Sequence, residues 1–328
     1  MSDRSLRVAV TFGAFDAQWL STALGPEVEA TVVAGLPDDE RRTALSRADA
    51  IFTWNWPREM RPGEGRGLPA RLVQLMSAGA DHIPFDQLPA GATVAGNVGA
   101  YAEPMAEHVL AMILCIYKQL RRHHDELSRG VWNQQEPTRS LRGARCLVVG
   151  YGGIGRATAT LLRAFGASIH ALNTSGRTDD PVELVGTLDQ LDQALAAADV
   201  VVLSLPLTRR TRRLIGAHEL AQMKPTATLV NVARGAIVDE DALYRHLVTH
   251  PDFTAAIDTW WVEPRHGDGF RIDHPFFDLP NVLGSPHNSG IVAGITEVAA
   301  ARAAANIRRF ARGEPLTGVV HQHDYVDA

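Results

Sequence analysis

The chain has 328 residues, a hydrophobic content of 45% and a formal net charge of −5 at pH 7. This length suffices for two domains of ordinary size, and the balance of apolar and charged residues excludes a largely disordered chain. There is no basic patch, so no nucleic-acid partner is expected, and no apolar run is long enough to span a bilayer. The polar start lacks a secretory signal, so we expect a soluble, cytoplasmic protein with no membrane partner.

Neither the cysteines nor the histidines indicate a metal site. Cys115 and Cys146 lie in apolar runs and are expected to be buried thiols. The histidines near the C-terminal half lack the spacing of a zinc site. These are His266, His274, His321 and His323.

Before residue 100, short apolar runs alternate with helical patterns, which is typical of a parallel sheet covered by helices. The predicted strands are Val8–Phe12, Val28–Val33, Ile51–Trp54, Leu72–Met76 and Thr93–Ala95. One long helix is predicted over Glu103–Leu127, because apolar residues recur there at helical spacing. Its apolar face is equally consistent with the core of the protein and with an interface between subunits.

A second βαβ series follows and predicts a doubly wound sheet. Its predicted strands are Cys146–Val149, Ser168–Leu172, Val200–Leu205, Thr228–Val232, Thr254–Asp258 and Val282–Gly284. Its predicted helices are Ile154–Phe165, Leu188–Ala198, Ala217–Gln222 and Asp239–His246. A last helix is predicted over about Val292 to Arg312, and it ends at Gly313.

The first strand of this series leads into the pattern G-x-G-x-x-G, and a helical pattern follows it. This strand–turn–helix context is the one that a dinucleotide-binding fingerprint requires. Gly150 allows the tight turn, Gly152 lets the backbone approach a pyrophosphate, and Gly155 lets helix and strand pack closely. The helix N-terminus then offers free N–H groups to the phosphates.

The residue that ends the second strand of such a fold contacts the adenosine ribose, and a carboxylate there rejects a 2′-phosphate. Eighteen positions after Gly155 the chain has Asn173 instead, followed by Thr174, Ser175 and Arg177. Hydroxyl groups and a guanidinium can bind a phosphate dianion. We therefore predict NADP(H) rather than NAD(H). The alternative is an ordinary polar loop with a solvated arginine.

Three polar residues, Arg234, Glu263 and His287, follow predicted strands, where open α/β sheets place their ligands. A protonated histidine can donate a proton to a forming alkoxide, and a carboxylate on its other ring nitrogen fixes the tautomer. An arginine can hold a substrate carboxylate and polarise a carbonyl. Together the three residues suit hydride reduction of a 2-keto acid. Singly, each is equally consistent with a surface, loop or turn residue.

At this point the sequence resembles the D-isomer-specific 2-hydroxyacid dehydrogenase family over nearly its whole length. Arg234 and Glu263 are 29 positions apart, and Glu263 and His287 are 24 apart, as in that family. The resemblance also rests on segments spread along the chain: Leu75–Ile83, Gly96–Gly99, Ala106–Ala111, Gly130–Trp132, Val149–Gly155, Leu205–Thr208, Asn231–Asp239, Asp258–Pro264 and Pro286–His287.

The resemblance implies two Rossmann-like domains with doubly wound parallel sheets. A nucleotide domain, about 100–288, would be inserted in a discontinuous substrate domain, about 1–99 plus 289–328. Arg234, Glu263 and His287 would form the catalytic set. The family usually forms homodimers through the nucleotide domain, with the helix at Glu103–Leu127 in the contact, so we expect a homodimer.

The resemblance also implies ligand contacts. Asp258 would bind the nicotinamide carboxamide, and the backbone of Ala78 and Gly79 would bind the substrate carboxylate, which Arg234 also holds. The remaining predicted cofactor contacts are Gly153, Ile154 and Arg156 along the pyrophosphate, Pro206 at the adenine, Thr211 near the phosphates, and Ala233.

The tryptophans depart from the family pattern and put the substrate in doubt. Trp260 and Trp261 replace more usual residues, and Trp54 and Trp56 follow a predicted strand. We assign Trp54 to the substrate pocket, with packing under a loop as the alternative. The predicted substrate is a small 2-keto acid such as glyoxylate or hydroxypyruvate.

The alternatives are an NAD-dependent dehydrogenase of another 2-hydroxy acid and a non-catalytic, dinucleotide-sensing corepressor or scaffold. Formate dehydrogenases resemble the chain at Asp258 to Trp260, but they carry Gln where Glu263 stands. Phosphite dehydrogenases use a Lys in the segment that matches residues 77–79, and none is present there.

Overall fold

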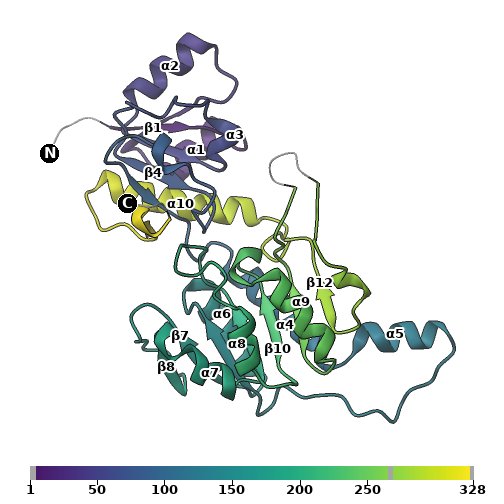
Figure 1. The fold of residues 1–328 in the computed structure, drawn as a ribbon. Coiled ribbons are helices and arrows are strands. Elements are labelled where there is room, and N and C mark those ends of the chain that lie inside the picture. The colour runs from purple at the N-terminus through teal and green to yellow at the C-terminus, as the bar shows by residue number, and fades with distance from the viewer. Residues whose placement is uncertain (1–4, 265–268, 326–328) are drawn as a thin grey trace. The chain divides into compact units, whose positions relative to one another are not determined.

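The computed structural model describes residues 5–264 and 269–325. The chain forms two compact units, residues 1–100 with 293–328, and residues 101–292 (Figure 1). Each unit contains its own β-sheet, and the second unit interrupts the first in the sequence. No helix in the described part of the chain is long and apolar enough to cross a membrane.

The first unit is built on a six-stranded sheet with the order β13-β5-β4-β3-β1-β2. All pairs are parallel except β13 with β5. The strands are β1 Leu6–Val10, β2 Val28–Val32, β3 Ala50–Thr53, β4 Leu72–Leu75, β5 Thr93–Ala95 and β13 Val319–Val320. The helices are α1 Ala17–Leu24, α2 Asp38–Arg47, α3 Trp56–Glu59 and α10 Ile295–Ala311. Apart from the short β13, each strand was predicted to within two residues.

The second unit is built on a seven-stranded sheet with the order β12-β11-β10-β9-β6-β7-β8, and all its strand pairs are parallel. The strands are β6 Arg145–Val149, β7 Ser168–Leu172, β8 Leu184–Gly186, β9 Val200–Leu203, β10 Thr228–Asn231, β11 Thr254–Ile257 and β12 Val282–Gly284. The helices are α4 Ala102–Tyr117, α5 Leu120–Ser128, α6 Gly153–Ala164, α7 Leu191–Ala197, α8 Ala217–Gln222 and α9 Glu240–Thr249.

The central strand β6 is buried on both faces. Leu147 and Val149 point into a core cluster that includes residues of α7, α8 and α9, whereas Cys146 and Val148 point into one with residues of α4 and α6. Side chains alternate between the faces of a strand, so helices on both sides account for its unbroken apolar run. Burial raises the pKa of the Cys146 thiol to about 12, which keeps it an uncharged core residue.

The order in which strands are added to the sheet reverses at β6, because β7 and β8 lie on one side of β6 and the later strands, beginning with β9, lie on the other. In a doubly wound sheet, the crevice at the carboxyl ends of the strands beside such a switch point binds the ligand. The predicted fold class is confirmed. The assignment of nucleotide and substrate binding to separate domains stays a prediction.

The single long helix predicted over Glu103–Leu127 is wrong. Gln119 adopts a left-handed conformation with φ 49° and separates α4 from α5. Before the break, Val109 and Ile113 are fully buried, but Leu120 beyond it is 57% exposed. The apolar spacing continues through residues 118–119 with no glycine or proline, so the sequence carries no signal for the break. The short edge strand β8 was also not predicted.

Candidate active site

The turn between β6 and α6 has the shape that its glycines were predicted to give it. Gly150 has φ +94°, and a Cβ atom there would meet the backbone nitrogen of Leu205 at 2.6 Å. A Cβ atom on Gly155 would meet the carbonyl oxygen of Gly150 at 2.5 Å. Both positions therefore require glycine, but for different reasons. Gly150 is required by its positive φ angle and by the lack of space for a Cβ atom, whereas Gly155 is required by the close packing alone.

The third glycine borders open space. A Cβ atom on Gly152 would meet nothing within 4 Å, and Gly152 precedes the first turn of α6, which contains Gly153 and Ile154. The N-cap residue of α6 is Gly152 itself, which has no side chain to cap the helix N-terminus. Its backbone N–H groups and the positive end of the helix dipole therefore suit a phosphate group, as the fingerprint requires.

The loop after β7 is organised by Asn173. Its side-chain oxygen accepts hydrogen bonds from the backbone N–H groups of Ser175 and Gly176, at 3.1 and 2.7 Å, and its amide donates to the carbonyl of Arg177 at 2.9 Å. Thr174, Ser175 and Arg177 are exposed, and within the described chain no partner for the Arg177 guanidinium is found. Asn173 thus supports a polar loop that presents hydroxyl groups and a cation.

Two other predicted cofactor contacts have structural partners. Arg156, in α6, forms an ion pair with Asp180 at 2.8 Å. Thr211 donates its hydroxyl hydrogen to the carbonyl of Pro206 at 2.7 Å, which closes the loop after β9. Both side chains order loops at the carboxyl end of the sheet, and their contacts with a cofactor stay predictions.

Asp258 directly follows β11 and is completely buried. Its Oδ1 accepts hydrogen bonds from the Ser285 hydroxyl at 2.5 Å and from the backbone N–H of Asn288 at 3.1 Å, and its Oδ2 accepts one from the N–H of Ser289 at 3.2 Å. These donors offset the cost of burying a carboxylate.

Ser289 is 3% exposed, and its hydroxyl has no hydrogen-bond partner among the residues that the structure describes. A buried hydroxyl is normally paired, so this one indicates a polar ligand group. Asp258 and Ser289, whose backbone N–H contacts that carboxylate, carry an acceptor and a hydroxyl group that suit the amide of a nicotinamide ring, which offers both a donor and an acceptor. With the glycine turn, these residues fit a dinucleotide.

His287 and Glu263 are paired. The Nδ1 atom of His287 lies 2.8 Å from both carboxylate oxygens of Glu263, and the backbone N–H of Trp260 donates to Glu263 Oε1 at 2.9 Å. The backbone of His287 is left-handed, with φ 53°, which is uncommon for a residue other than glycine. The carboxylate fixes the orientation of the ring.

Arg234 follows β10, and Asn231 shapes this turn. The Asn231 amide donates to the carbonyl of Arg234 at 2.9 Å, and its oxygen accepts from the N–H of Ala233 at 3.1 Å. A Cβ atom on Gly235 would meet the backbone of Trp260 at 2.4 Å, so the segment after Arg234 touches the one that leads to Glu263. The loops carrying the three predicted catalytic residues thus lie at one edge of the sheet.

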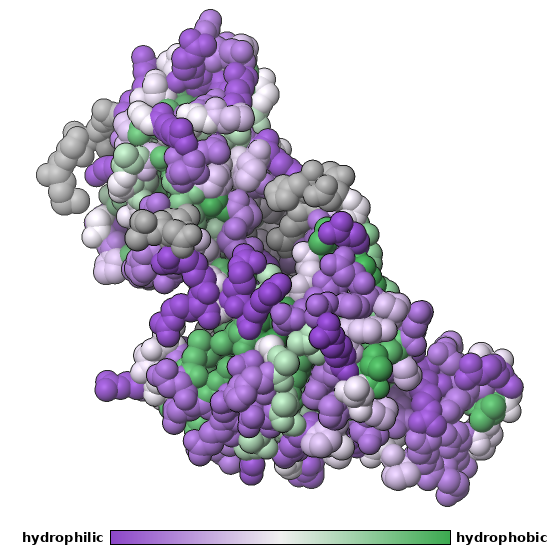
Figure 2. Space-filling model, viewed as in Figure 1, coloured by the Kyte–Doolittle hydropathy of each residue, from purple (hydrophilic) through white to green (hydrophobic). Residues whose placement is uncertain are grey.

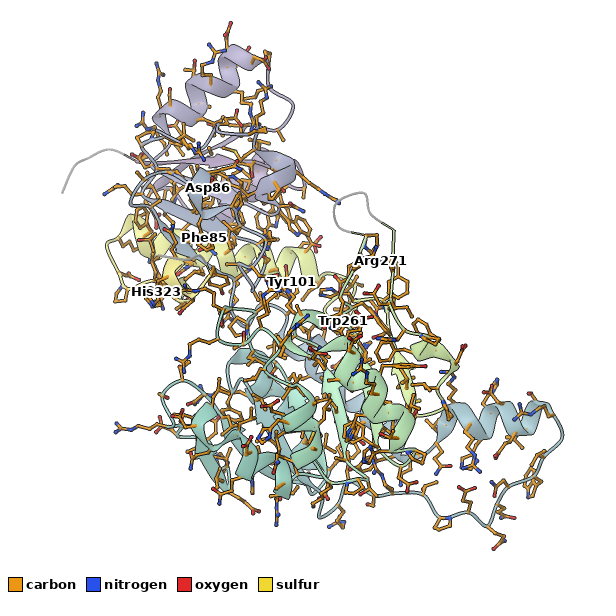
Figure 3. All side chains as sticks on the ribbon, in the orientation of Figure 1. Phe85, Asp86, Tyr101, Trp261, Arg271 and His323 are labelled. Atoms are coloured by element: carbon orange, nitrogen blue, oxygen red, sulfur yellow. The ribbon has the colours of Figure 1, made fainter. Side chains whose placement is uncertain are left out.

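A pocket of about 550 Å³ lies beside the paired histidine and glutamate. Three aromatic side chains line it, those of Trp260, Phe270 and Phe277. Trp261, labelled in Figure 3, instead stacks on Phe276 at 5.2 Å and donates its indole N–H to the carbonyl of Val238. Of these two tryptophans, Trp260 lines the pocket and Trp261 packs against the body of the unit.

The other predicted substrate residues belong to the first unit. Trp54 follows β3, is 38% exposed and contacts Phe12 edge to face. Ala78 and Gly79 follow the neighbouring strand β4, so all three lie at the carboxyl edge of that sheet. Trp56, by contrast, is 1% exposed and belongs to the core.

Sequence reasoning did not identify Glu59 as an organiser of this edge. Its carboxylate accepts hydrogen bonds from the hydroxyl groups of Thr11 and Thr53 and from the backbone N–H groups of Trp54 and Asn55, at 2.6 to 3.0 Å. It joins the loops after β1 and β3. Trp54 is thereby held in place by its backbone, although its contact with substrate stays a prediction.

One group of metal-ligand types lies outside these sites. Asp192, His218 and Glu219 have potential ligand atoms within 4.8 Å of one another. His218 is paired with Asp192 at 2.9 Å, which raises the pKa of His218, and Glu219 accepts a hydrogen bond from the N–H of Gly216. These contacts account for the group without a metal ion.

Comparison with known proteins identifies the family. Residues 110–289 match the model of the D-isomer specific 2-hydroxyacid dehydrogenase, NAD binding domain. Among curated proteins, the hydroxypyruvate reductase of Thermotoga maritima is 31% identical over 224 residues, covering 67% of this chain and 71% of the relative. The D-3-phosphoglycerate dehydrogenase of Methanocaldococcus jannaschii is 27% identical over 297 residues, 89% of this chain. The chain spans about half of that relative's length, 55%.

Solved structures agree over nearly the whole chain. A putative formate dehydrogenase from Pyrobaculum aerophilum has a TM-score of 0.81 at 26% identity, with 98% of this chain and 100% of that chain covered. A D-isomer specific 2-hydroxyacid dehydrogenase from Xanthobacter autotrophicus, in complex with NADPH and MES, has a TM-score of 0.75 at 27% identity, with 97% and 100% covered. The chain belongs to the D-isomer-specific 2-hydroxyacid dehydrogenase family, which confirms the resemblance seen in the sequence.

The contrast between two glycines gives a test of the turn. Gly155→Ala is expected to destabilise the protein by about 1–3 kcal/mol, because the added methyl group overlaps the carbonyl of Gly150. Gly152→Ala, in open space, is expected to leave the unfolding transition in urea unchanged but to weaken dinucleotide binding measured by fluorescence titration. Equal binding by Gly152→Ala and wild type would contradict the placement of the pyrophosphate.

Proposed function

We propose that the protein is an oxidoreductase that transfers a hydride between NADP(H) and a small 2-keto acid, such as glyoxylate or hydroxypyruvate, to give the D-2-hydroxy acid. The observation that carries the proposal is the pairing of His287 Nδ1 with both oxygens of Glu263, at 2.8 Å, at the sheet edge where Arg234 also lies. Family membership and the hydroxypyruvate reductase relative support the same chemistry.

Each residue has a role that follows from its chemistry. Bound NADPH supplies the hydride. Glu263 holds Nδ1 of His287, so proton transfer to the alkoxide oxygen is assigned to Nε2 of the same ring. Arg234 binds the substrate carboxylate and polarises the keto group, because a guanidinium offers paired donors to oxygen. In the reverse direction the neutral imidazole accepts the hydroxyl proton.

Replacing the paired residues tests this assignment. His287→Ala is expected to lower kcat for glyoxylate reduction by about 10²-fold or more, because the general acid is lost. Glu263→Gln keeps an oxygen for the Trp260 N–H but removes the negative charge beside the His287 ring, so a smaller loss in kcat is expected. Steady-state kinetics monitored by NADPH absorbance measure both. Wild-type turnover by His287→Ala would refute the assignment.

The preference for NADP(H) is supported by the loop after β7. No carboxylate stands at Asn173, the exposed hydroxyl groups of Thr174 and Ser175 lie beside it, and Arg177 extends its guanidinium from the same loop. The chain from Xanthobacter autotrophicus, which is similar along its whole length, binds NADPH. A 2′-phosphate would gain charge-assisted hydrogen bonds from this loop.

A cofactor comparison tests the preference. Arg177→Ala is expected to lower kcat/KM for NADPH by about tenfold, the scale of one charge-assisted hydrogen bond, and to leave kcat/KM for NADH unchanged. Arg47→Ala removes the same charge from an exposed position in α2 and serves as the matched control. A wild-type preference for NADH that Arg177→Ala does not alter would overturn the NADP(H) proposal.

We further propose that the protein is a homodimer joined through the second unit. Helix α5 has no buried residue and extends away from the sheet of its unit (Figure 1). We call residues 120–136, which comprise α5 and the segment after it, the arm. Arg122 connects its two parts, because it forms ion pairs with Glu126 and Glu136 at 2.9 and 2.6 Å. Its surface is mostly hydrophilic with a small apolar spot (Figure 2). The arm's exposed large apolar side chains are Leu120, Leu127, Val131 and Trp132.

An ordered arm with exposed apolar side chains supports a subunit contact. Leu127→Asp is expected to convert the dimer to a monomer in analytical ultracentrifugation, because a buried carboxylate would have no partner there. Val248→Asp changes an equally exposed residue of α9, 53% against 55% for Leu127, and is expected to keep the dimer. A monomeric wild-type protein would contradict the proposal.

A further inference from the structure

A series of hydrogen-bonded side chains connects α4 to the buried carboxylate of Asp258. His108 lies in α4, and its Nε2 is 3.0 Å from the Ser285 hydroxyl oxygen. That hydroxyl lies 2.5 Å from Asp258 Oδ1 and donates to it. None of the residues assigned to proton transfer or substrate binding belongs to this series of hydrogen-bonded side chains.

The direction of these hydrogen bonds follows from the groups involved. A hydroxyl has one hydrogen, and Ser285 gives it to the carboxylate, so its oxygen must accept from His108. His108 therefore carries a hydrogen on Nε2. Its Nε2 also lies 3.8 Å from Asp258 Oδ1.

The two oxygens of Asp258 have different surroundings. Oδ1 accepts hydrogen bonds from Ser285 and from the N–H of Asn288, whereas the one donor to Oδ2 among the described residues is the N–H of Ser289 at 3.2 Å. The unpartnered hydroxyl of Ser289 lies on the same residue as that N–H group. Among the described residues, Oδ1 thus accepts two hydrogen bonds and Oδ2 accepts one, from the backbone of the residue whose hydroxyl has no partner there.

We propose that His108 is a positioning residue for the nicotinamide amide. Acting through Ser285, it fixes Asp258 Oδ1 and so sets the rotation of the carboxylate at which Oδ2 accepts from the amide N–H, with Ser289 beside it. The proposal rests on the dinucleotide binding in the proposed function. A hydrogen bond that orients a ligand-binding side chain without touching the ligand commonly changes ligand affinity by about tenfold or more.

Three ligands separate this role from a structural one. NADPH carries the amide, the reduced 3-acetylpyridine analogue of NADPH has a methyl group in place of the amide nitrogen, and 2′,5′-ADP lacks the nicotinamide ring. His108→Phe is expected to weaken NADPH about tenfold in fluorescence or calorimetric titration, since it removes the donor but keeps a planar ring. Binding of the analogue and of 2′,5′-ADP is expected to change less than about twofold.

Rescue variants complete the test. His108→Gln can place an amide N–H where Nε2 stands and is expected to recover most of the NADPH affinity. Ser285→Ala is expected to cause the same selective loss of NADPH affinity. The double variant His108→Phe/Ser285→Ala is expected to cause no further loss, because both substitutions break the same series of hydrogen bonds. Ser285→Thr keeps the hydroxyl and serves as its control.

The outcomes are distinct. A loss on all three ligands alike, or no loss on NADPH in either His108→Phe or Ser285→Ala, overturns the proposal. Selective loss in a protein that reduces no 2-keto acid supports the role of His108 and refutes the proposed reaction instead. Should NADH bind more tightly than NADPH, NADH, its acetylpyridine analogue and 5′-AMP take the places of the three ligands.

Discussion

The continuation of the parallel backbone ladder beyond the strands is the constraint on which the site depends. Directly past the end of β11, the N–H of Asp258 donates to the carbonyl of Asn231, the last residue of β10, at 3.0 Å, and the N–H of His287 donates to the carbonyl of Asp258 at 2.8 Å. Three loops that leave adjacent strands are therefore joined residue by residue. Since parallel strands end at one edge, this ladder brings together side chains that are distant in the sequence.

Side-chain hydrogen bonds add to the backbone hydrogen bonds that join these loops. Asn231 shapes the turn to Arg234, Asp258 accepts hydrogen bonds from the loop that carries His287, and the backbone of Trp260 supports Glu263. Each of these contacts links one loop to itself or to its neighbour. Hydrogen bonds of this kind fix the positions of the loops. Proton and hydride transfer in general require groups that are held in fixed positions.

Much of this was predictable from the sequence because it follows from periodicity and from fixed steric needs. The strands of both sheets are apolar runs of the right length, and the glycines of the β6–α6 turn can be identified because no other residue fits at Gly150 or Gly155. The position of Arg234, Glu263 and His287 after strands predicted that they share one edge. Their assigned roles, like those of Trp54, Ala78 and Gly79, stay predictions.

The rest depended on contacts that one-dimensional patterns do not contain. Gln119 takes a left-handed conformation that its residue type does not favour, so the bend between α4 and α5 left no sequence signal. The hydrogen-bond partners of Asn231, Glu59 and His108 lie on distant segments or on the backbone. Ser289 was inconspicuous as one serine of many, and its importance lies in the absence of a partner in a buried place within the described chain.

The left-handed backbone of His287 has a consequence for how the protein tolerates change. A side chain in this conformation costs about 1 kcal/mol, and glycine or asparagine at the same position would relieve that cost. Selection for thermal stability alone would therefore favour replacement of His287 by one of these residues. Under the proposed function, the histidine is kept for proton transfer at a cost in stability, which is a trade-off between stability and activity.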